Sequence, residues 1–236
     1  MPPRPLTSIS TGSERNKGLK KGGSFLGSKI KKWLVAFAMG LIFLSAGAVL
    51  SSGAEISQSG VKAEREKVTK WRKERDQFFK THQRSPLTPA EKRDFKGLAY
   101  FPFRAEYYSE GQIDRETLRV DDPKYYATFL TNKGTNKRYI RYGKFRFSLA
   151  GRDHMVEVYK SILGDNLFIP FKDLTNGKET YEGGRYIDAE ILPGYRMVLN
   201  FNMAYYPSCA YNEKFTCALP PRENDLPVEI KAGEKN

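Results

Sequence analysis

Seven side chains in the C-terminal half of the sequence have the types and spacing needed to hold a polar ligand. An apolar stretch ending at Phe171 runs into a polar loop with two adjacent glycines. Asn200 and Asn202 share one face of a later extended stretch, because side chains alternate along a strand. Small-molecule pockets combine a few such polar groups with apolar walls. The sequence therefore predicts a ligand-binding site formed by Glu179, Tyr181, Arg185, Asn200, Asn202, Tyr205 and Glu223.

Some of the same residues suit a hydrolase-like enzyme. Glu179 or Glu223 would act as general acid or base, and Arg185 would hold an anion. Such chemistry needs two carboxylates facing one cleft. The sequence contains no G-x-S-x-G, H-E-x-x-H, P-loop or G-x-G-x-x-G pattern. Catalysis is thus left open, and the cofactor is unknown.

The cysteines predict a disulfide rather than a metal site. Cys209 and Cys217 have seven residues between them, and an oxidised pair is expected if the domain lies outside the cytoplasm. A structural zinc usually needs four ligands, but the only histidines, His82 and His154, are distant in sequence. A redox pair usually has two intervening residues.

The element that places this region in the cell is an uncharged run of 18 residues, 33–50. As a helix it spans roughly 27 Å, enough to cross a hydrocarbon core. The basic segment before it predicts a single-pass anchor in the inner (cytoplasmic) membrane, with the N-terminus inside and the C-terminal domain periplasmic. A cleaved signal peptide is the alternative, with small residues at 46–48 or 52–54. The long basic segment favours the anchor.

The net charge of +13 does not indicate a nucleic-acid partner. Residues 1–50 carry eight cations and one acid, and residues 51–84 carry nine cations and five acids. Residues 85–236 are nearly balanced, with 23 cations and 21 acids. A phosphate-binding protein needs cations clustered on its folded surface. The positive charge therefore indicates how the chain is oriented in the membrane, and we expect no nucleic-acid partner.

Composition divides the chain into four parts. We expect a disordered cytoplasmic tail at 1–32, the anchor or signal at 33–50, a linker with juxtamembrane helices at 51–97, and a β-rich extracytoplasmic domain at 98–236. A charged helix is predicted over 61–84. It has one apolar face that must pack on the downstream domain or on a partner, made by Val61, Val68, Trp71, Phe78 and Phe79. Thr88 and Glu91 predict a capping box for a second helix over 90–96.

The domain from residue 98 onward alternates aromatic or β-branched residues with polar ones. Gly143 divides one long stretch into two parts of opposite parity, which indicates a bulge that resets the inward face. The fold class expected is mainly β, a small antiparallel barrel or sandwich with N-terminal helices, preceded by one transmembrane helix. The predicted strands are 137–149, 154–160, 166–171, 185–191, 195–202 and 226–232.

Four long segments carry a resemblance to a known family. They are YGKFRFSL, LFIPFKDLTNGKETYEGGRYID, LNFNMAYYPSCAY and CALPPRENDLPVEIKAGEK. Over roughly residues 65–235 the chain resembles a bacterial family of unknown function, numbered 1684 among such domains. Family members often have proline after the second cysteine, where this chain has Ala218. The resemblance implies that the E-T-Y-x-G-G-R and N-x-N-x-A-Y-x-P-x-C-A-Y segments belong together, which supports a shared site.

Three functional hypotheses follow. The first is a membrane-tethered binding domain whose open end holds a small ligand or a protein partner. The second is an accessory or structural subunit of a membrane protein complex, docked through the aromatic face of the juxtamembrane helix. The third is the hydrolase described above.

Overall fold

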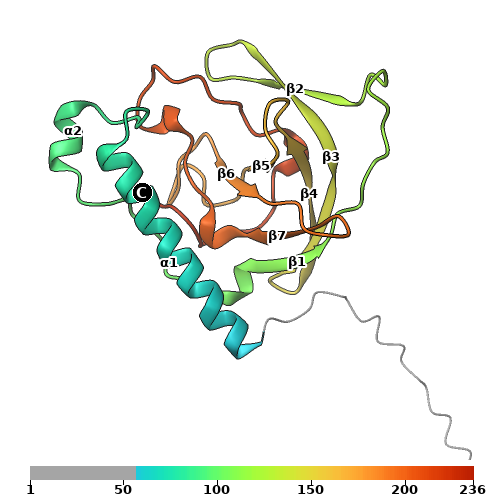
Figure 1. Cartoon of the computed structure of the whole chain (residues 1–236), viewed down its shortest axis with the longest axis horizontal. Helices are drawn as coiled ribbons and strands as arrows, with labels where there is room; N and C mark the ends of the chain where they lie inside the picture. The colour runs from blue at the N-terminus through green and yellow to red at the C-terminus, as the bar shows by residue number, and fades with distance from the viewer. Residues whose placement is uncertain (1–56) are drawn as a thin grey trace, which may run out of the picture. The chain divides into compact units, whose positions relative to one another are not determined.

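The structure is a computed structural model that describes residues 57–236, which fall within one compact unit (Figure 1). The fold is mainly β, with two antiparallel sheets and a helix at the N-terminal side. The predicted tail, the predicted anchor and most of the predicted linker lie outside the described residues. Within residues 57–236, no helix has the length and apolarity needed to cross a bilayer.

Two helices precede the β structure. α1 spans Gln58–Thr81 and is capped by the hydroxyl of Ser57, so it begins three residues before the predicted start. α2 spans Pro89–Asp94. Its predicted capping box is confirmed, because Thr88 accepts from the Glu91 N–H and the Glu91 carboxylate accepts from the Thr88 N–H.

The apolar face of α1 packs on the β structure rather than staying free for a partner. Trp71 lies 6.4 Å from the ring of Tyr205 and 6.3 Å from the ring of Tyr100, centroid to centroid. Arg72 donates to the carbonyls of Phe101 and Asn202, so polar contacts fix the helix as well. Figure 1 shows α1 lying along one side of the sheets.

All seven strands pair with antiparallel neighbours. The larger sheet has the order β2-β3-β4-β5-β6, and the smaller sheet is β1-β7. The strands are β1 (Tyr108–Gln112), β2 (Tyr126–Leu130), β3 (Asn136–Leu149), β4 (Arg152–Lys160), β5 (Leu167–Phe171), β6 (Arg185–Ala189) and β7 (Arg196–Asn200). Short 3-10 turns lie at Ala105–Tyr107, Phe201–Met203, Ser208–Ala210 and Arg222–Asn224.

The bulge predicted at Gly143 is confirmed. The register between β3 and β4 shifts between Arg141 and Gly143. A Cβ at position 143 would come within 2.5 Å of the Asp114 carbonyl oxygen, so glycine is needed for this close approach. Before the bulge Tyr139 belongs to one apolar cluster, and after it Phe145 belongs to the other.

The two apolar clusters use opposite faces of the larger sheet. In β5 and β6 neighbouring residues alternate between them, as Ile169 and Phe168 do, because successive side chains point to opposite faces. The inner cluster includes Phe145, Val156, Ile169, Phe171, Ile187, Met197 and Leu199. The outer cluster consists of Ala127, Phe129, Tyr139, Tyr159, Phe168, Tyr186 and Ala218, with Tyr205 packed against it.

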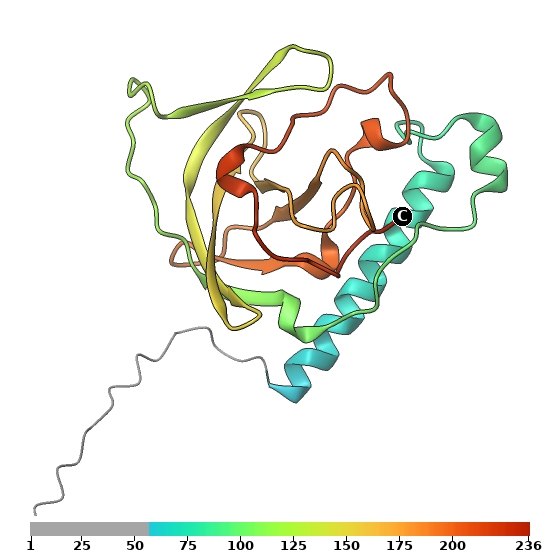
Figure 2. The ribbon, with the colours of Figure 1, turned by 180° about the vertical axis from the view of Figure 1, so that it is seen from behind.

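The expected strand over 226–232 is wrong. This segment is buried at Leu226, Ile230 and Ala232 but forms no strand, and it runs back toward α1 in both views (Figures 1 and 2). Its first half exchanges two backbone hydrogen bonds with Lys172 and Leu174, just after β5, whereas the carbonyls of Ile230 and Ala232 accept from a buried arginine side chain. Conversely, β1 and β2 are strands that were not predicted from the sequence.

Cys209 and Cys217 are bonded, as predicted, with their Cα atoms 6.1 Å apart. The bonded loop is attached to the turn after β2. Asn132 accepts from the Cys217 N–H through its side chain at 2.8 Å and donates its own N–H to the Cys217 carbonyl at 3.1 Å.

Candidate functional site

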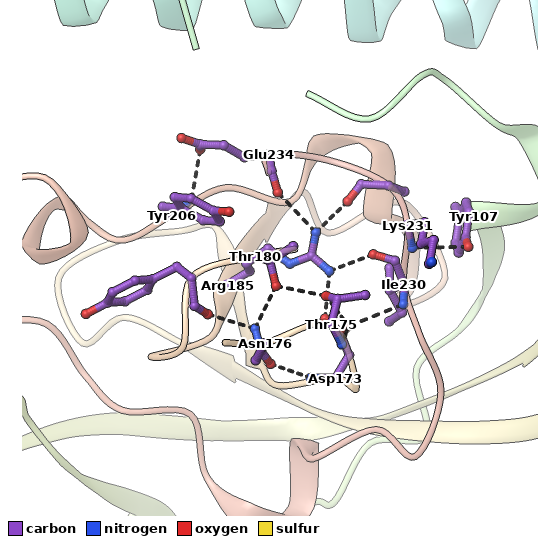
Figure 3. Close-up of polar contacts among 12 residues, drawn as sticks. Tyr107, Asp173, Thr175, Asn176, Thr180, Arg185, Tyr206, Ile230, Lys231 and Glu234 are labelled. Atoms are coloured by element: carbon purple, nitrogen blue, oxygen red, sulfur yellow. Dashed lines mark hydrogen bonds and ion pairs between the residues drawn. The ribbon is translucent and has the colours of Figure 1, made fainter. Parts of the chain in front are cut away.

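Arg185 is a buried structural residue. It begins β6, points into the core and is fully inaccessible to solvent. Its Nη2 donates to Asp173 Oδ2 at 2.6 Å and to the Ile230 carbonyl at 2.8 Å (Figure 3). Its Nη1 donates to the carbonyls of Ala232 at 2.5 Å and Glu234 at 3.3 Å. All four Nη hydrogens are thus used internally, and only Nε lacks an acceptor among the described residues.

The carboxylate that faces Arg185 is equally enclosed. Asp173 Oδ1 accepts from the Thr175 N–H at 2.8 Å and from the Thr175 hydroxyl at 2.5 Å. Thr175 in turn shares a hydrogen bond with Thr180, and Asn176 donates to Thr180 and to the Tyr181 carbonyl. These bonds close the loop between β5 and β6 on itself, as Figure 3 shows. A densely hydrogen-bonded buried network of this kind favours one backbone arrangement.

The rest of the E-T-Y-x-G-G-R segment also serves the scaffold. Glu179 forms an exposed ion pair with Lys231 at 2.8 Å, and the ring of Tyr181 lies 5.8 Å from that of Tyr206. Gly184 has φ +90°, and a Cβ there would approach the Phe171 carbonyl oxygen to 2.7 Å. Only glycine fits this conformation and this contact.

Asn200 and Asn202 tie the sheets to the N-terminal segments. Asn200 Nδ2 donates to the buried Glu64 of α1 at 2.8 Å. Asn202 exchanges two 2.9 Å hydrogen bonds with the backbone of Arg104. The two amides also bond to each other. They are therefore satisfied inside the molecule and hold α1 and the chain entering β1 in place.

Glu223 is exposed, whereas its neighbour Asn224 is fully buried. Asn224 Oδ1 accepts from the Glu157 N–H at 2.7 Å, and Nδ2 donates to the carbonyls of Glu157 at 2.9 Å and Pro170 at 2.8 Å. β4 and β5 pair only at Tyr159–Phe168 and Lys160–Leu167, so this amide bridges the backbones where they separate. The buried contacts at this turn thus belong to Asn224, whereas Glu223, the residue predicted from the sequence to bind a ligand, lies on the surface.

Of the seven predicted residues, Tyr205 contacts a residue that lines a groove, although it does not line the groove itself. Its hydroxyl donates to Asp188 Oδ2 at 2.7 Å, and Asp188 lines an open groove of about 630 Å³ on the outer face of the larger sheet. The groove is also lined by Lys137, Arg138 and Tyr139 of β3, by Ile162, Leu163 and Asp165 of the β4–β5 loop, and by Phe168 of β5.

The groove combines an aromatic floor with charges of both signs. Tyr139 and Phe168 are buried and stacked, with ring centroids 4.9 Å apart. The cations Lys137 and Arg138 and the acids Asp165 and Asp188 all line it. Ile162 and Leu163 form an apolar lip, and Leu163 is 97% exposed. Such a groove suits a molecule with an apolar body and polar ends.

Burial changes the acid–base behaviour of the groove. It raises the pKa of Tyr139 to about 12, with a smaller contribution from Asp188. Burial also raises the pKa of the Asp188 carboxyl, although the residue keeps exposed surface, and the hydrogen bond from Tyr205 opposes that rise. The Tyr205 hydroxyl has a pKa well above its usual value because of burial and the nearby Asp188. Both phenols therefore stay neutral near pH 7.

Metal or hydrolytic chemistry receives no structural support within residues 57–236. This part of the chain holds no group of three or more His, Cys, Asp or Glu residues arranged to bind a metal ion. Glu179 pairs with Lys231 on the surface, and Glu223 is exposed beside Asn224. Arg185 cannot hold an external anion because its Nη groups are buried and occupied.

Comparison with known proteins identifies the family. The family model described as protein of unknown function, DUF1684, matches residues 93–235. The chain belongs to this family. The DUF1684 region thus contains the whole β structure, the Arg185 network and the groove residues. The resemblance to this family is thus confirmed, and in this chain the polar residues of the segments that carried it mainly build the scaffold.

A solved structure supports the same fold. It is a solution NMR structure of an uncharacterized protein from Haloarcula marismortui, with 30% sequence identity and a TM-score of 0.60. The similarity covers 76% of this chain and 98% of the archaeal chain. No curated protein matches the sequence significantly.

Proposed function

We propose that this chain is a membrane-tethered extracytoplasmic domain that binds a small amphipathic ligand in the groove formed by β3, the β4–β5 loop and β6. The groove carries the proposal, because its volume of about 630 Å³ lies within the usual range of ligand pockets. Its aromatic floor favours an apolar or aromatic group. Lys137, whose ammonium lies over the Tyr139 ring, and Asp188 favour a ligand that carries both an anionic and a cationic group.

We further infer that the two sheets join as a small barrel. Asp114, just after β1, bridges Lys144 of β3, and Tyr205, which follows β7, bridges Tyr186 of β6. Large side chains such as Phe145, Phe171 and Phe201 fill the interior. The ligand site proposed here therefore lies on the outer face and not, as the sequence suggested, at an open end.

The membrane tether and the periplasmic location are part of the proposal. The uncharged run at 33–50 and the basic segment before it support an anchor with the domain outside. The Cys209–Cys217 bond supports an oxidising compartment. Protease protection in spheroplasts tests the topology: the domain should be digested from outside while the cytoplasmic membrane is intact.

Ligand binding is tested with free phenylalanine and phenylalanine dipeptides, compared with their N-acetylated forms. We expect the zwitterions to shift the backbone NMR signals of the β4–β5 loop and the acetylated forms to bind at least tenfold more weakly. The variant Lys137→Ala/Leu163→Ser should lose this binding. Lys133→Ala/Leu174→Ser, which changes exposed residues outside the groove, should retain it. Equal effects in both variants, or no shifts in the loop, would reject the groove as the site.

An accessory role in a membrane complex is favoured by one observation. Ile162 and Leu163 are adjacent and exposed by 46% and 97%, and exposed apolar neighbours often mark protein contacts. A subunit docked there should separate from its complex when Leu163 becomes Asp. Native size analysis of detergent extracts at native expression would then show a smaller species. A monomeric wild-type protein in that analysis argues against this role.

A further inference from the structure

Folding sorts the charges of α1 into a buried set and an exposed set. Glu64 is buried and accepts from Asn200. Asp76 is partly buried and accepts from the Leu98 N–H at 3.0 Å. Arg75 turns inward to Glu234 at 3.2 Å, and Arg72 turns inward to two backbone carbonyls. Packing thus removes both acids and two arginines from the outer surface.

The exposed surface that remains on this segment is strongly cationic. Between residues 58 and 84, seven cations are exposed against two acids. The cations are Lys62, Arg65, Lys67, Lys70, Lys73, Lys80 and Arg84, and the acids are Glu66 and Glu74. The sequence of the same residues, 58–84, contains nine cations and four acids, so the folded segment presents a higher proportion of positive charge than its composition suggests.

Three of these lysines form the centre of the outward face. Lys62, Lys73 and Lys80 are separated by 11 and 7 residues, which places them on one side of a helix with 3.6 residues per turn. None of the three has an ion-pair partner among the described residues. Lys70 makes only a weak contact with Glu74, at 3.7 Å between two exposed groups.

Chain length limits how far this face can lie from a membrane. Seven residues, 51–57, separate the predicted anchor from the first residue of α1. Fully extended, they reach about 25 Å. That reach is a maximum, so the linker also permits α1 to lie within a Debye length of about 8–10 Å of the bilayer, where a polybasic segment is attracted to anionic lipid. A helix that begins at such a distance can lay its cationic side on the surface.

We propose that the outward face of α1, centred on Lys62, Lys73 and Lys80, binds the headgroups of anionic phospholipids and holds the β domain against the membrane. The inference rests on the proposed tether, which brings α1 to the bilayer. The tether supplies proximity, and the lysines determine how the domain lies on the surface.

The test uses the full chain reconstituted into vesicles of phosphatidylcholine alone or of phosphatidylcholine with phosphatidylglycerol at 3:1. A donor dye at Gln77→Cys, an exposed position of α1, reports energy transfer to acceptor-labelled lipid headgroups. We expect transfer at least twofold higher in the anionic vesicles, with the increase lost in 0.5 M NaCl. Flotation with pure phosphatidylcholine vesicles in 0.5 M NaCl measures the tether separately.

Two matched variants identify the residues. Lys73→Glu/Lys80→Glu should abolish the increase caused by phosphatidylglycerol. Lys124→Glu/Lys133→Glu changes the charge equally at exposed positions away from α1 and should preserve it. Equal transfer in both lipid mixtures, or the same loss in both variants, would assign α1 a merely solvated face and overturn the proposal. An increase seen only with protein-containing native membranes would overturn it in favour of an acidic protein partner. Failure of flotation alone would refute the tether but not the lipid contact.

Discussion

Tyr205 donates a hydrogen bond of 2.7 Å to Asp188, and its ring packs on Trp71 of α1. The residue that helps dock the helix therefore also holds one wall of the groove. A shift of α1 relative to the sheets would therefore act on the groove through the Tyr205 side chain. The proposed lipid contact and the proposed ligand site are in this way adjacent parts of one structure.

This relationship predicts a change in acidity. A hydrogen bond to a carboxylate favours its charged form, so Tyr205→Phe should raise the pKa of Asp188 further above its usual value. Carbon-13 NMR titration of the Asp188 carboxyl measures the effect. Tyr159→Phe removes a similar hydrogen bond to Glu157 and should leave the Asp188 titration unchanged. A lower or unaltered pKa in Tyr205→Phe contradicts the assigned role.

Arg185→Met should destabilise the protein by about 3–5 kcal/mol, because it leaves Asp173 buried without its cation. The ion pair between Lys231 and Glu179 offers the surface comparison, and Lys231→Ala should destabilise the protein far less, because water screens an exposed pair. Urea unfolding of the two variants measures both. Similar losses would show that the buried position of Arg185 has no special importance for stability.

Asn224 and Glu223 form a matched pair of neighbours. Asn224→Ala should cost at least about 2 kcal/mol, since each buried backbone group left unpaired costs about 1–3 kcal/mol. Glu223→Ala, at an exposed position, should change the free energy of unfolding by no more than about 0.5 kcal/mol. Hydrogen exchange at the Glu157 amide should accelerate only in Asn224→Ala. The prediction fails if both variants unfold at the same denaturant concentration.

The free energy of unfolding should decrease as pH rises, because of Glu234. Burial raises the pKa of its carboxyl to about 7, even though Arg75 and the Tyr206 N–H favour the charged form. The folded pKa lies above the unfolded value of about 4.5, so the stabilising contribution is complete below about pH 4.5 and is lost as pH rises through 7. The shift corresponds to a difference on the order of 3 kcal/mol. Urea unfolding between pH 4 and pH 8 should show wild type losing stability relative to Glu234→Gln, and a constant difference would contradict this.

Local patterns account for what the sequence predicted well. Alternation of side chains located β3 to β7, the Thr88 capping box marked α2, and the change of parity at Gly143 marked the bulge. These signals depend on residues within a few positions of one another. β1 was missed because its sequence, YSEGQ, is polar and contains glycine. It pairs with β7 across a long stretch of sequence.

Distant partners account for what the sequence could not predict. Arginine is almost never fully buried without a partner, and the three carbonyl acceptors of Arg185 lie 45–49 residues further along the chain. No local pattern marks either end of that contact. The same contact accounts for the second half of the failed strand at 226–232, because the carbonyls of Ile230 and Ala232 bind the Arg185 side chain instead of a sheet. The groove also joins β3, β5 and β6, so its residues form no continuous motif.

The dependence of Arg185 on the carbonyls at 230, 232 and 234 sets an order of events during biosynthesis. A polypeptide leaves the ribosome or a translocation channel from its N-terminus onward. The Arg185 guanidinium therefore has to remain hydrated until the carbonyls at 230, 232 and 234 have also emerged. The chain can close its interior only after nearly all of residues 185–234 are free, so export in an unfolded form is compatible with this architecture.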